Sequence, residues 1–412
     1  MSIRDSQTEP LMPDVGVIAV VAEQWGGRWL SRQQILTRMA RYFHVIWVDP
    51  QLGWQKLWFG NESSVTRNPD STMPTASGFT VCRQSALLPK LYSPAFLGTL
   101  TARRHLGRAR AQLMSRGCKK VILHVWRPEF GSAIEMVDHE ISCYHIVDEY
   151  SFSSVESPIS EEESALISRV DQVFIHSPAL MEKKGDINPN TEYVTNGVDY
   201  DAFTTPAPEP SDLAGIAHPR IAYIGRIKIQ LDWVVLDHLS GQHPDWQFVF
   251  VGPMGHMGDC ADIQDRVFAR ENVHYLGNKS IVDIPGYTQH VDVCLLSYTL
   301  NNYTKYIFPL KLHECLAAGK AVVGSDIRSL RDFDSVIKIA KTPEEWSSHI
   351  AAALSATDAT VAEVRRSVAK DFDWDHLVHR IATTLCARIG ESFLVRMDDI
   401  GGVDSAHGPS AT

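Results

Sequence analysis

"PLKLHECLAAGKAVVGSD" (309–326) combines a short helix with a buried strand. Pro309 suits the first position of a helix, where its missing N–H would be unpaired in any case. We predict the helix over residues 310–318, with Gly319 ending it. The apolar run "AVVGS" that follows is typical of a strand buried on both faces, as in parallel sheets covered by helices. This segment therefore predicts an α/β fold.

The same alternation of short apolar runs and amphipathic segments continues on both sides of this stretch. In the first half the predicted strands are 15–22, 44–49, 79–83, 120–126, 143–148, 172–177 and 192–196. In the second half they are 221–225, 246–252, 273–277, 292–297, 321–325 and 336–340. Such runs favour two successive parallel βα domains, with ligands bound beyond the carboxyl ends of the strands.

"TTPAPEPSDLAGIAHP" (204–219) is rich in proline and small residues and has no periodicity, so we predict that it links the two domains. We expect a first domain over 1–207 and a second over 208–373. A helix at 374–395 should pack back on the first domain. The tail, 396–412, is predicted to be disordered.

Composition narrows the function classes. The 412 residues carry a net charge of −10, which argues against nucleic acid as a partner. No apolar run reaches the roughly 18 residues of a membrane-spanning helix, and the polar N-terminus is not typical of a signal peptide. Seven scattered cysteines indicate free thiols in a reducing cytosol. We therefore expect a cytoplasmic protein.

The first candidate ligand site is the predicted helix itself. Its N-terminus at Pro309 and Leu310 would present free N–H groups to a phosphate. Lys311 adds a positive charge, and Glu314, one turn on, could accept two hydrogen bonds from a ribose diol. An isolated Lys-x-x-Glu is more often a surface ion pair, but the closely packed "LAAG" and the buried strand that follow favour a ligand site here.

A second stretch, "YIGRIKIQLDW" (223–233), ends a strand at Gly225 and continues with Arg226 and Lys228. The glycine allows close backbone approach, and the two cations could bind a pyrophosphate. Gly252 and Gly277 end two neighbouring strands, and their backbone could flank a base. Ordinary turn chemistry would explain these glycines as well.

Residues 15–390 resemble the GT-B glycosyltransferases, most closely glycosyltransferase family 4 and its bacterial teichuronic-acid-type members. "YIGRIK", "PDWQFVFVGP" and "NVHYLGNKSIVDIPGYTQHVDVCLLSYTLNNYTKYIFPLKLHECLAAGKAVVGS" carry the resemblance, and "TNGVDYDAF" adds to it in the first domain. It implies a nucleotide-sugar donor, linked to UDP or GDP, and transfer with retained configuration. It also implies that Glu314 binds the ribose and that Arg226 and a lysine bind the phosphates.

The chain departs from that family at two positions, of which the first matters more. The family motif is a Glu, seven residues and a second Glu; Glu314 is the second, but Tyr306 stands in place of the first. Because the first carboxylate contacts the sugar in the family, the sugar contacts here must differ. Asn302 and Thr304 are candidates to replace them. Lys228 also stands earlier in the chain than the lysine that the family has in this region.

Two stretches of the first domain carry candidate acceptor residues. Asp148, in "HIVDEYS", ends a strand and could orient or deprotonate an acceptor hydroxyl; a helix cap is the alternative. "EQWGGR" (23–28) follows the first strand. We assign acceptor contacts to its last four residues, Trp25, Gly26, Gly27 and Arg28, although Trp25 is equally typical of a packing residue.

We predict no metal and no cofactor. His124, His145 and His176 lie near strand ends but lack ligand spacing, so buried packing roles are favoured. "DFDWD" (371–375) contains an Asp-x-Asp pair. It precedes a helix instead of following a strand, which favours capping.

The segment from Arg83 to Lys120 contains nine basic residues and no acids, with apolar side chains interleaved in its first part. Such a segment is typical of a surface that binds anionic lipid, although a solvated helix face is the alternative. The aromatic loop 53–60 could enter the same interface.

These observations lead to one main interpretation. We expect an enzyme that transfers a sugar from a nucleoside diphosphate to a glycan or lipid-linked acceptor at the cytoplasmic face of the membrane, in bacterial polysaccharide biosynthesis. Arg226 and Lys311 would stabilise the leaving phosphate. A sugar-nucleotide epimerase and a non-catalytic scaffold, both with the same architecture, are the alternatives.

Overall fold

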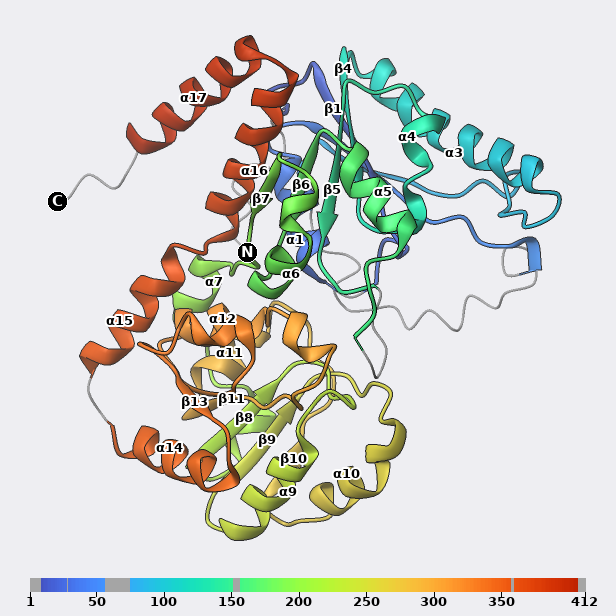
Figure 1. The fold of residues 1–412 in the computed structure, drawn as a ribbon. Coiled ribbons are helices and arrows are strands. Elements are labelled where there is room, and N and C mark those ends of the chain that lie inside the picture. The colour runs from blue at the N-terminus through green and yellow to red at the C-terminus, as the bar shows by residue number, and fades with distance from the viewer. Residues whose placement is uncertain (1–8, 28, 56–74, 151–155, 357–358, 407–412) are drawn as a thin grey trace.

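The computed structural model describes residues 9–27, 29–55, 75–150, 156–356 and 359–406. The chain forms two α/β domains, which lie one above the other in Figure 1. Neighbouring strands are parallel throughout both sheets. The predicted fold class and the predicted strands are confirmed.

The first domain has a seven-stranded sheet in the order β3-β2-β1-β4-β5-β6-β7. Its strands are β1 Val15–Val20, β2 His44–Val48, β3 Phe79–Cys82, β4 Lys120–Val125, β5 Ile141–Ile146, β6 Gln172–Ile175 and β7 Thr191–Tyr193. Its helices are α1 Ser31–Met39, α3 Ala95–Ser115, α4 Ala133–Met136, α5 Glu161–Arg169 and α6 Pro178–Lys184. The strands β1, β2, β5 and β6 are buried along their whole length, which explains their continuous apolar sequences.

The second domain has a six-stranded sheet in the order β10-β9-β8-β11-β12-β13. Its strands are β8 Arg220–Ile224, β9 Gln247–Val251, β10 Val273–Tyr275, β11 Val293–Leu296, β12 Ala321–Ser325 and β13 Lys338–Ala340. Its helices are α8 Ser211–Ala214, α9 Trp233–Gln242, α10 Ala261–Phe268, α11 Ile284–Gln289, α12 Lys311–Ala317, α13 Arg328–Arg331, α14 Pro343–Ser355 and α15 Ala359–Lys370.

Two chain crossings connect the domains. The first follows β7 through α7 Tyr200–Thr204, and the second returns through α16 Trp374–Ile389. They meet where the Val198 N–H donates to Phe372 O and the Trp374 N–H donates to Val198 O, each over 2.9 Å. The Asp373 carboxylate caps α16 by accepting from the Asp375 N–H over 2.7 Å, as predicted for the Asp-x-Asp pair.

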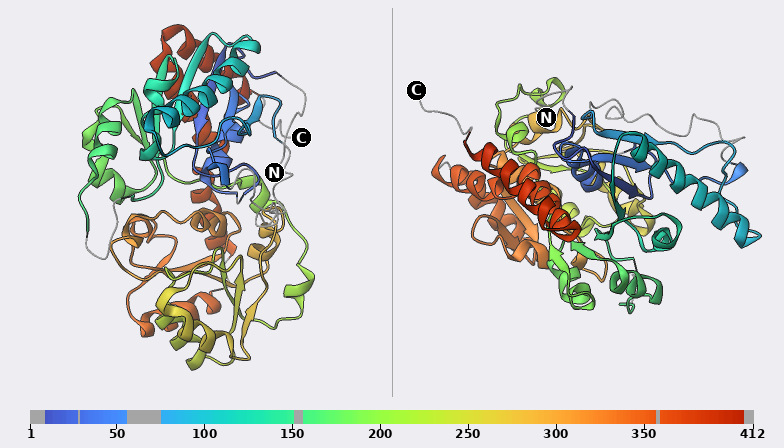
Figure 2. Two further views of the ribbon diagram at one scale, coloured as in Figure 1. Left: turned by 90° about the vertical axis from the view of Figure 1, so that its right-hand side faces the viewer. Right: turned by 90° about the horizontal axis from the view of Figure 1, so that it is seen from above.

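Helix α16 lies along the first domain, as Figures 1 and 2 show. Its buried face belongs to the same apolar cluster as β1, β2 and α1. The chain therefore ends on the domain in which it began, although its last helices follow the second sheet in sequence.

The predicted disorder after residue 395 is wrong for most of the tail. Helix α17 runs over Glu391–Ala406. Met397 is fully buried in the first domain's core, and the Arg396 guanidinium holds both carboxylate oxygens of Asp14, at 2.9 and 2.7 Å. These long-range contacts stabilise a helix that the glycine-rich local sequence would not favour by itself.

Helix α12 ends as predicted, at Gly319, but begins two residues after Pro309. Gly319 has φ +73°. The N–H groups of Gly319 and Lys320 donate to the carbonyls of Leu316 and Cys315, each over 2.9 Å, which is the Schellman arrangement. Leu310 is the N-cap, so Pro309 precedes the cap and is not the first helical residue.

Two properties of the described chain bear on its setting. All seven cysteines are free, and six of them are buried; Cys260 is half-buried. Within the ranges given above, none of the helices combines the length and apolar character needed to cross a bilayer.

His313 of α12 is enclosed by aromatic rings. Its ring is stacked on Phe372, with centroids 4.0 Å apart, and lies 5.5 Å from Phe308 and 5.2 Å from Phe333. Neither ring nitrogen has a hydrogen-bond partner among the described residues. Burial lowers the pKa of His313 to about 3, so the imidazole is neutral in the folded protein.

We predict that His313→Phe makes the protein less sensitive to acid. Between about pH 6.5 and pH 3 the unfolded chain binds a proton on this histidine and the folded chain does not, so folding stability falls as pH falls. From pH 7 to pH 5 the wild type should lose about 2 kcal/mol more than the variant. Urea unfolding at both pH values measures this difference; equal losses would contradict the assigned pKa.

Candidate functional site

Two glycines, Gly225 and Gly252, let the ends of β8 and β9 lie close together at the carboxyl edge of the second sheet. Gly225 has φ +149°, and its N–H donates to Val251 O over 2.7 Å. Gly252 has φ +137°, and its N–H donates to Gly277 O over 2.8 Å. A Cβ on Gly252 would lie 2.2 Å from the carbonyl oxygen of Gly225. The backbone segments at Gly225 and Gly252 therefore lie so close together that Gly252 leaves no room for a side chain.

The Lys311 side chain lies over Gly225. A Cβ on that glycine would be 1.7 Å from Cε of Lys311 and 2.4 Å from its Nζ. The ammonium nitrogen is 5.3 Å from the ring centroid of Tyr223. Burial lowers the pKa of Lys311, but Tyr223, Tyr298 and Glu314 outweigh burial, so the net direction is upward and the charge is kept.

Glu314 follows Lys311 by one turn of α12, and both side chains are half-buried. Burial raises the pKa of Glu314, and the Lys311 charge opposes that rise. The pair is therefore not the exposed surface ion pair that Lys-x-x-Glu forms on an isolated helix.

Two further cations follow Gly225. Arg226 is exposed, and its Nε would be 2.6 Å from a Cβ on Gly255. The Lys228 ammonium lies 5.8 Å from the ring centroid of Tyr303. With Lys311, these side chains bring three positive charges to one sheet edge, an arrangement suited to a diphosphate.

Asp148 faces this edge from the first domain, two residues after β5. Its Oδ1 accepts from the Glu149 N–H over 2.9 Å, and its Oδ2 lies 3.5 Å from the Tyr303 hydroxyl of the second domain. Burial raises the pKa of Asp148, whereas the Glu149 N–H, Lys228 and Arg127 lower it. Because the Tyr303 ring also lies against the Lys228 ammonium, candidate residues of both domains come together around Tyr303.

The start of α12 bears on the predicted phosphate contact. Pro309 is buried, and Leu310 packs against the apolar core of the first domain. The helix has only seven residues. The Lys311 side chain therefore supplies more of the positive potential here than the helix N-terminus does.

Thr304 does not fit its predicted role in ligand contact. It is fully buried, and its hydroxyl donates to Thr299 O and accepts from the Asn301 N–H. Its neighbour Asn302 is half-buried in the same turn. The sequence alone does not show that the Thr304 hydroxyl is used up inside its own turn, because its partners Thr299 O and the Asn301 N–H are brought to it only when the turn forms.

Trp25 is mainly a packing residue. Its backbone N–H donates to the Asp49 carboxylate over 2.8 Å, and its ring centroid lies 4.6 Å from Phe79 and 5.2 Å from Trp47. Gly26 has φ +96°, and Gly27 follows it in the turn. Arg28 lies outside the described residues.

Two of the three histidines, His124 and His145, lie against Trp126, and all three are buried. The His145 ring is stacked on Trp126 with centroids 4.4 Å apart, and the His124 ring is 5.7 Å from that of His145. Burial lowers the pKa of His124 to about 3 and that of His176 to about 4. Both are neutral packing groups, although His124 has no hydrogen-bond partner among the described residues. Across the described ranges no cluster of His, Cys, Asp and Glu is arranged to hold a metal.

The basic segment forms helix α3 and the loop before it, at the outer edge of the first domain (Figure 1). Arg103, Arg104 and Arg108 are exposed. Large apolar side chains are exposed beside them, namely Leu87, Tyr92, Phe96 and Leu100. Gly53 pairs with Lys90, which brings the exposed Trp54 next to this loop. Residues 56–60 of the aromatic loop lie outside the described residues.

Several residues in the cleft were not singled out from the sequence. Tyr303 contacts Asp148, and Gly255 lies against Arg226. A cavity of about 570 Å³ opens between the domains, with Glu156, Lys183 and Tyr306 among its lining residues. The sequence signal for Tyr303 is its place in "LNNYTK", but only the docked domains bring it to Asp148.

The second domain resembles known proteins in sequence. Residues 218–356 match the family model of Glycosyl transferases group 1. The Bacillus subtilis (strain 168) protein TuaH, named as a teichuronic acid biosynthesis glycosyltransferase, is 30% identical over 234 residues. That alignment covers 54% of this chain and 58% of TuaH.

Solved structures extend the likeness to the whole fold. Anabaena Alr3699/HepE in complex with UDP and glucose has a TM-score of 0.62 at 17% identity, covering 90% of this chain and 99% of that one. The trehalose-6-phosphate synthase OtsA has a TM-score of 0.62 at 12% identity, covering 90% and 98%. The galactosyltransferase WaaB has a TM-score of 0.55 at 13% identity, covering 91% of this chain and 99% of that one. The two parallel-sheet domains are therefore the GT-B fold.

We predict that Gly225→Ala displaces Lys311 and weakens binding of nucleoside diphosphates. The new methyl group would occupy the place of Cε, and the loss of one charge-assisted phosphate contact should raise Kd by about tenfold or more. Isothermal titration calorimetry with UDP and GDP measures this Kd in the wild type and the variant.

Gly117→Ala is the matched control, because Gly117 also has a positive φ (+87°) but open space around a Cβ. It reproduces the backbone strain of about 1–2 kcal/mol without moving Lys311. Equal nucleotide affinities in the two variants would contradict the proposed contribution of Lys311, lying over Gly225, to nucleotide binding.

Proposed function

We propose that this chain, which has the GT-B fold and a glycosyl transferases group 1 domain at residues 218–356, transfers a sugar from a nucleoside diphosphate to a hydroxyl group. The acceptor would be a glycan or a lipid-linked glycan in bacterial polysaccharide biosynthesis. The supporting observation is the Lys311 side chain over Gly225, with Glu314 one turn away and Asp148 opposite.

The donor would bind along the carboxyl edge of the second sheet. Lys311 and Arg226 would hold the diphosphate, Lys228 would add charge near it, and Glu314 would accept hydrogen bonds from the ribose. The backbone near Gly252 and Gly277 would flank the base. The HepE structure holds UDP and glucose, which supports a UDP-linked donor here.

Charge stabilisation of the leaving phosphate would come from protein cations, without a metal ion. Two or three fixed positive charges near a developing diphosphate oppose the charge that builds up as the sugar–phosphate bond breaks. Lys311 is suited to this because its neighbours keep its pKa high.

Asp148 would orient the acceptor hydroxyl. In a transfer that retains the anomeric configuration, the acceptor oxygen arrives on the face from which the phosphate departs. A phosphate oxygen is then the nearest base for the acceptor proton, and the carboxylate fixes the direction of attack.

The enzyme would act at the cytoplasmic face of the membrane, held by anionic lipid. The exposed arginines of α3 supply the charge, and Leu87, Tyr92 and Phe96, which are 85%, 76% and 69% exposed, supply the apolar contact. A lipid-linked acceptor would make this attachment useful.

Glu314→Ala should weaken nucleotide binding, whereas Asp148→Ala should not. Loss of the ribose hydrogen bonds should cost about 2 kcal/mol, or roughly a thirtyfold higher Kd for UDP. Asp148→Ala should keep the wild-type Kd and lose turnover. Calorimetry with UDP and GDP, and product analysis with and without added glycan acceptor, test both. Epimerisation of the donor in the absence of an acceptor would indicate the epimerase alternative. Absence of nucleotide binding would indicate the non-catalytic scaffold.

The membrane proposal predicts that Arg103→Glu, Arg104→Glu and Arg108→Glu together abolish sedimentation with vesicles containing anionic phospholipid. At about 1 kcal/mol per basic residue, the three reversals should weaken binding by at least about a hundredfold. Lys338→Glu, Lys341→Glu and Lys370→Glu change the net charge equally on the second domain. If this control triple variant also failed to sediment, net charge alone would explain the effect.

A further inference from the structure

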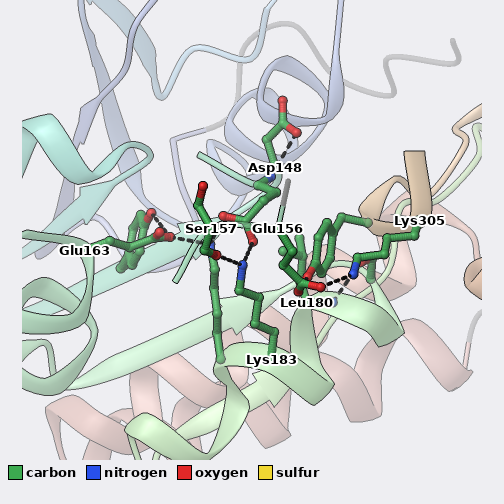
Figure 3. A network of polar contacts seen from close by, with 12 residues as sticks. Asp148, Glu156, Ser157, Glu163, Leu180, Lys183 and Lys305 are labelled. Atoms are coloured by element: carbon green, nitrogen blue, oxygen red, sulfur yellow. Dashed lines mark hydrogen bonds and ion pairs between the residues drawn. The ribbon is translucent and has the colours of Figure 1, made fainter. Parts of the chain in front are cut away.

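The 3₁₀ turn Thr304–Tyr306 belongs to the second domain but is held by the first. Tyr306 is only 4% exposed and lies among the apolar core residues of the first domain. Its hydroxyl donates to the Glu156 carboxylate, and the Lys305 ammonium lies 2.6 Å from the other oxygen of Glu156. Figure 3 shows Lys305 reaching toward Glu156, with Lys183 close by.

The Tyr306 ring also contacts two ammonium groups. The nitrogens of Lys183 and Lys305 lie 5.1 and 4.8 Å from its centroid, within the range of cation–π attraction. Lys183 donates in addition to Ser157 O over 2.9 Å and pairs with Glu149 at 3.1 Å. Tyr306 therefore helps to hold Lys183 against Glu149.

Glu149 is the centre of a buried network of charges. It is 1% exposed and also lies 3.3 Å from the ammonium of Lys184, which pairs with the buried Glu163 at 2.8 Å. Buried charges are tolerated only while their partners stay in place, because removing one leaves another uncompensated. The position of Glu149 thus depends on Lys183 and Lys184.

This network is connected to the candidate acceptor carboxylate. Asp148 precedes Glu149 and accepts its backbone N–H over 2.9 Å. Tyr303, three residues before Tyr306, reaches the same carboxylate from the second domain. One short turn of the second domain therefore contacts Asp148 directly and, through Lys183 and Glu149, indirectly.

We propose that Tyr306 is a positioning residue that sets the orientation of Asp148 when the two domains close on each other. The proposal rests on the acceptor role given to Asp148 above. A carboxylate at position 306 could not do this, because it would meet the charge of Glu156. A phenol provides a ring for two ammoniums and a hydroxyl for that carboxylate.

Tyr306→Ala should lower kcat for transfer by about tenfold or more, with the donor KM within about twofold of wild type. If Tyr306 acts through Asp148, then Tyr306→Ala combined with Asp148→Ala should be no slower than Asp148→Ala alone. Multiplying losses in the double variant would overturn the proposal. Unchanged turnover in Asp148→Ala would instead overturn the role of Asp148.

A second measurement needs no enzymatic activity. Hydrogen exchange of the peptide that contains residues 146–150 should be at least about fivefold faster in Tyr306→Ala, with Tyr306→Phe in between. Arg328→Ala is the control, since it removes another interdomain ion pair, to Glu182 at 2.8 Å, outside this network. Wild-type exchange in Tyr306→Ala, or equal acceleration in Arg328→Ala, would refute positioning by Tyr306.

Discussion

Lys311 can lie across the end of β8 only because residue 225 has no side chain. This contact brings a half-buried ammonium to the carboxyl edge of the second sheet, where Arg226 and Lys228 add further charge. The crowding of Gly225 and Gly252 keeps the strand ends close enough for the edge to act as one surface. The candidate site therefore depends on the absence of side chains as much as on the charged groups.

A second set of compensated buried charges lies in the first domain, beside its contact with Tyr306 of the second. Carboxylates and ammoniums alternate from Glu163 through Lys184, Glu149 and Lys183, and the Tyr306 ring closes the series from the other domain. Such a series is weak evidence for stability, because desolvation offsets most of the attraction. Its effect is on geometry, because each buried charge of the first domain has its partner in one place.

Much of the fold could be predicted from the sequence, because strands buried on both faces leave continuous apolar runs. Gly225, Lys311 and Glu314 could be named as candidates because a backbone approach and a helical spacing are visible locally. Thr304 was assigned wrongly, since its hydroxyl serves the turn that contains it. The part of the tail that the structure describes, residues 396–406, was also assigned wrongly, since Arg396 and Met397 contact residues more than 300 positions earlier in the chain.

The amino-acid sequence determined the two parallel sheets, the place where each strand ends and the charged groups carried just beyond those ends. Local periodicity and glycine placement are enough for that, because they act within a few residues. Only the tertiary structure decided that Asp148 meets Tyr303, and that Tyr306 enters the opposite domain. Those contacts join residues about 120 to 155 positions apart, and the relative placement of two folded domains, not local spacing, brings them together.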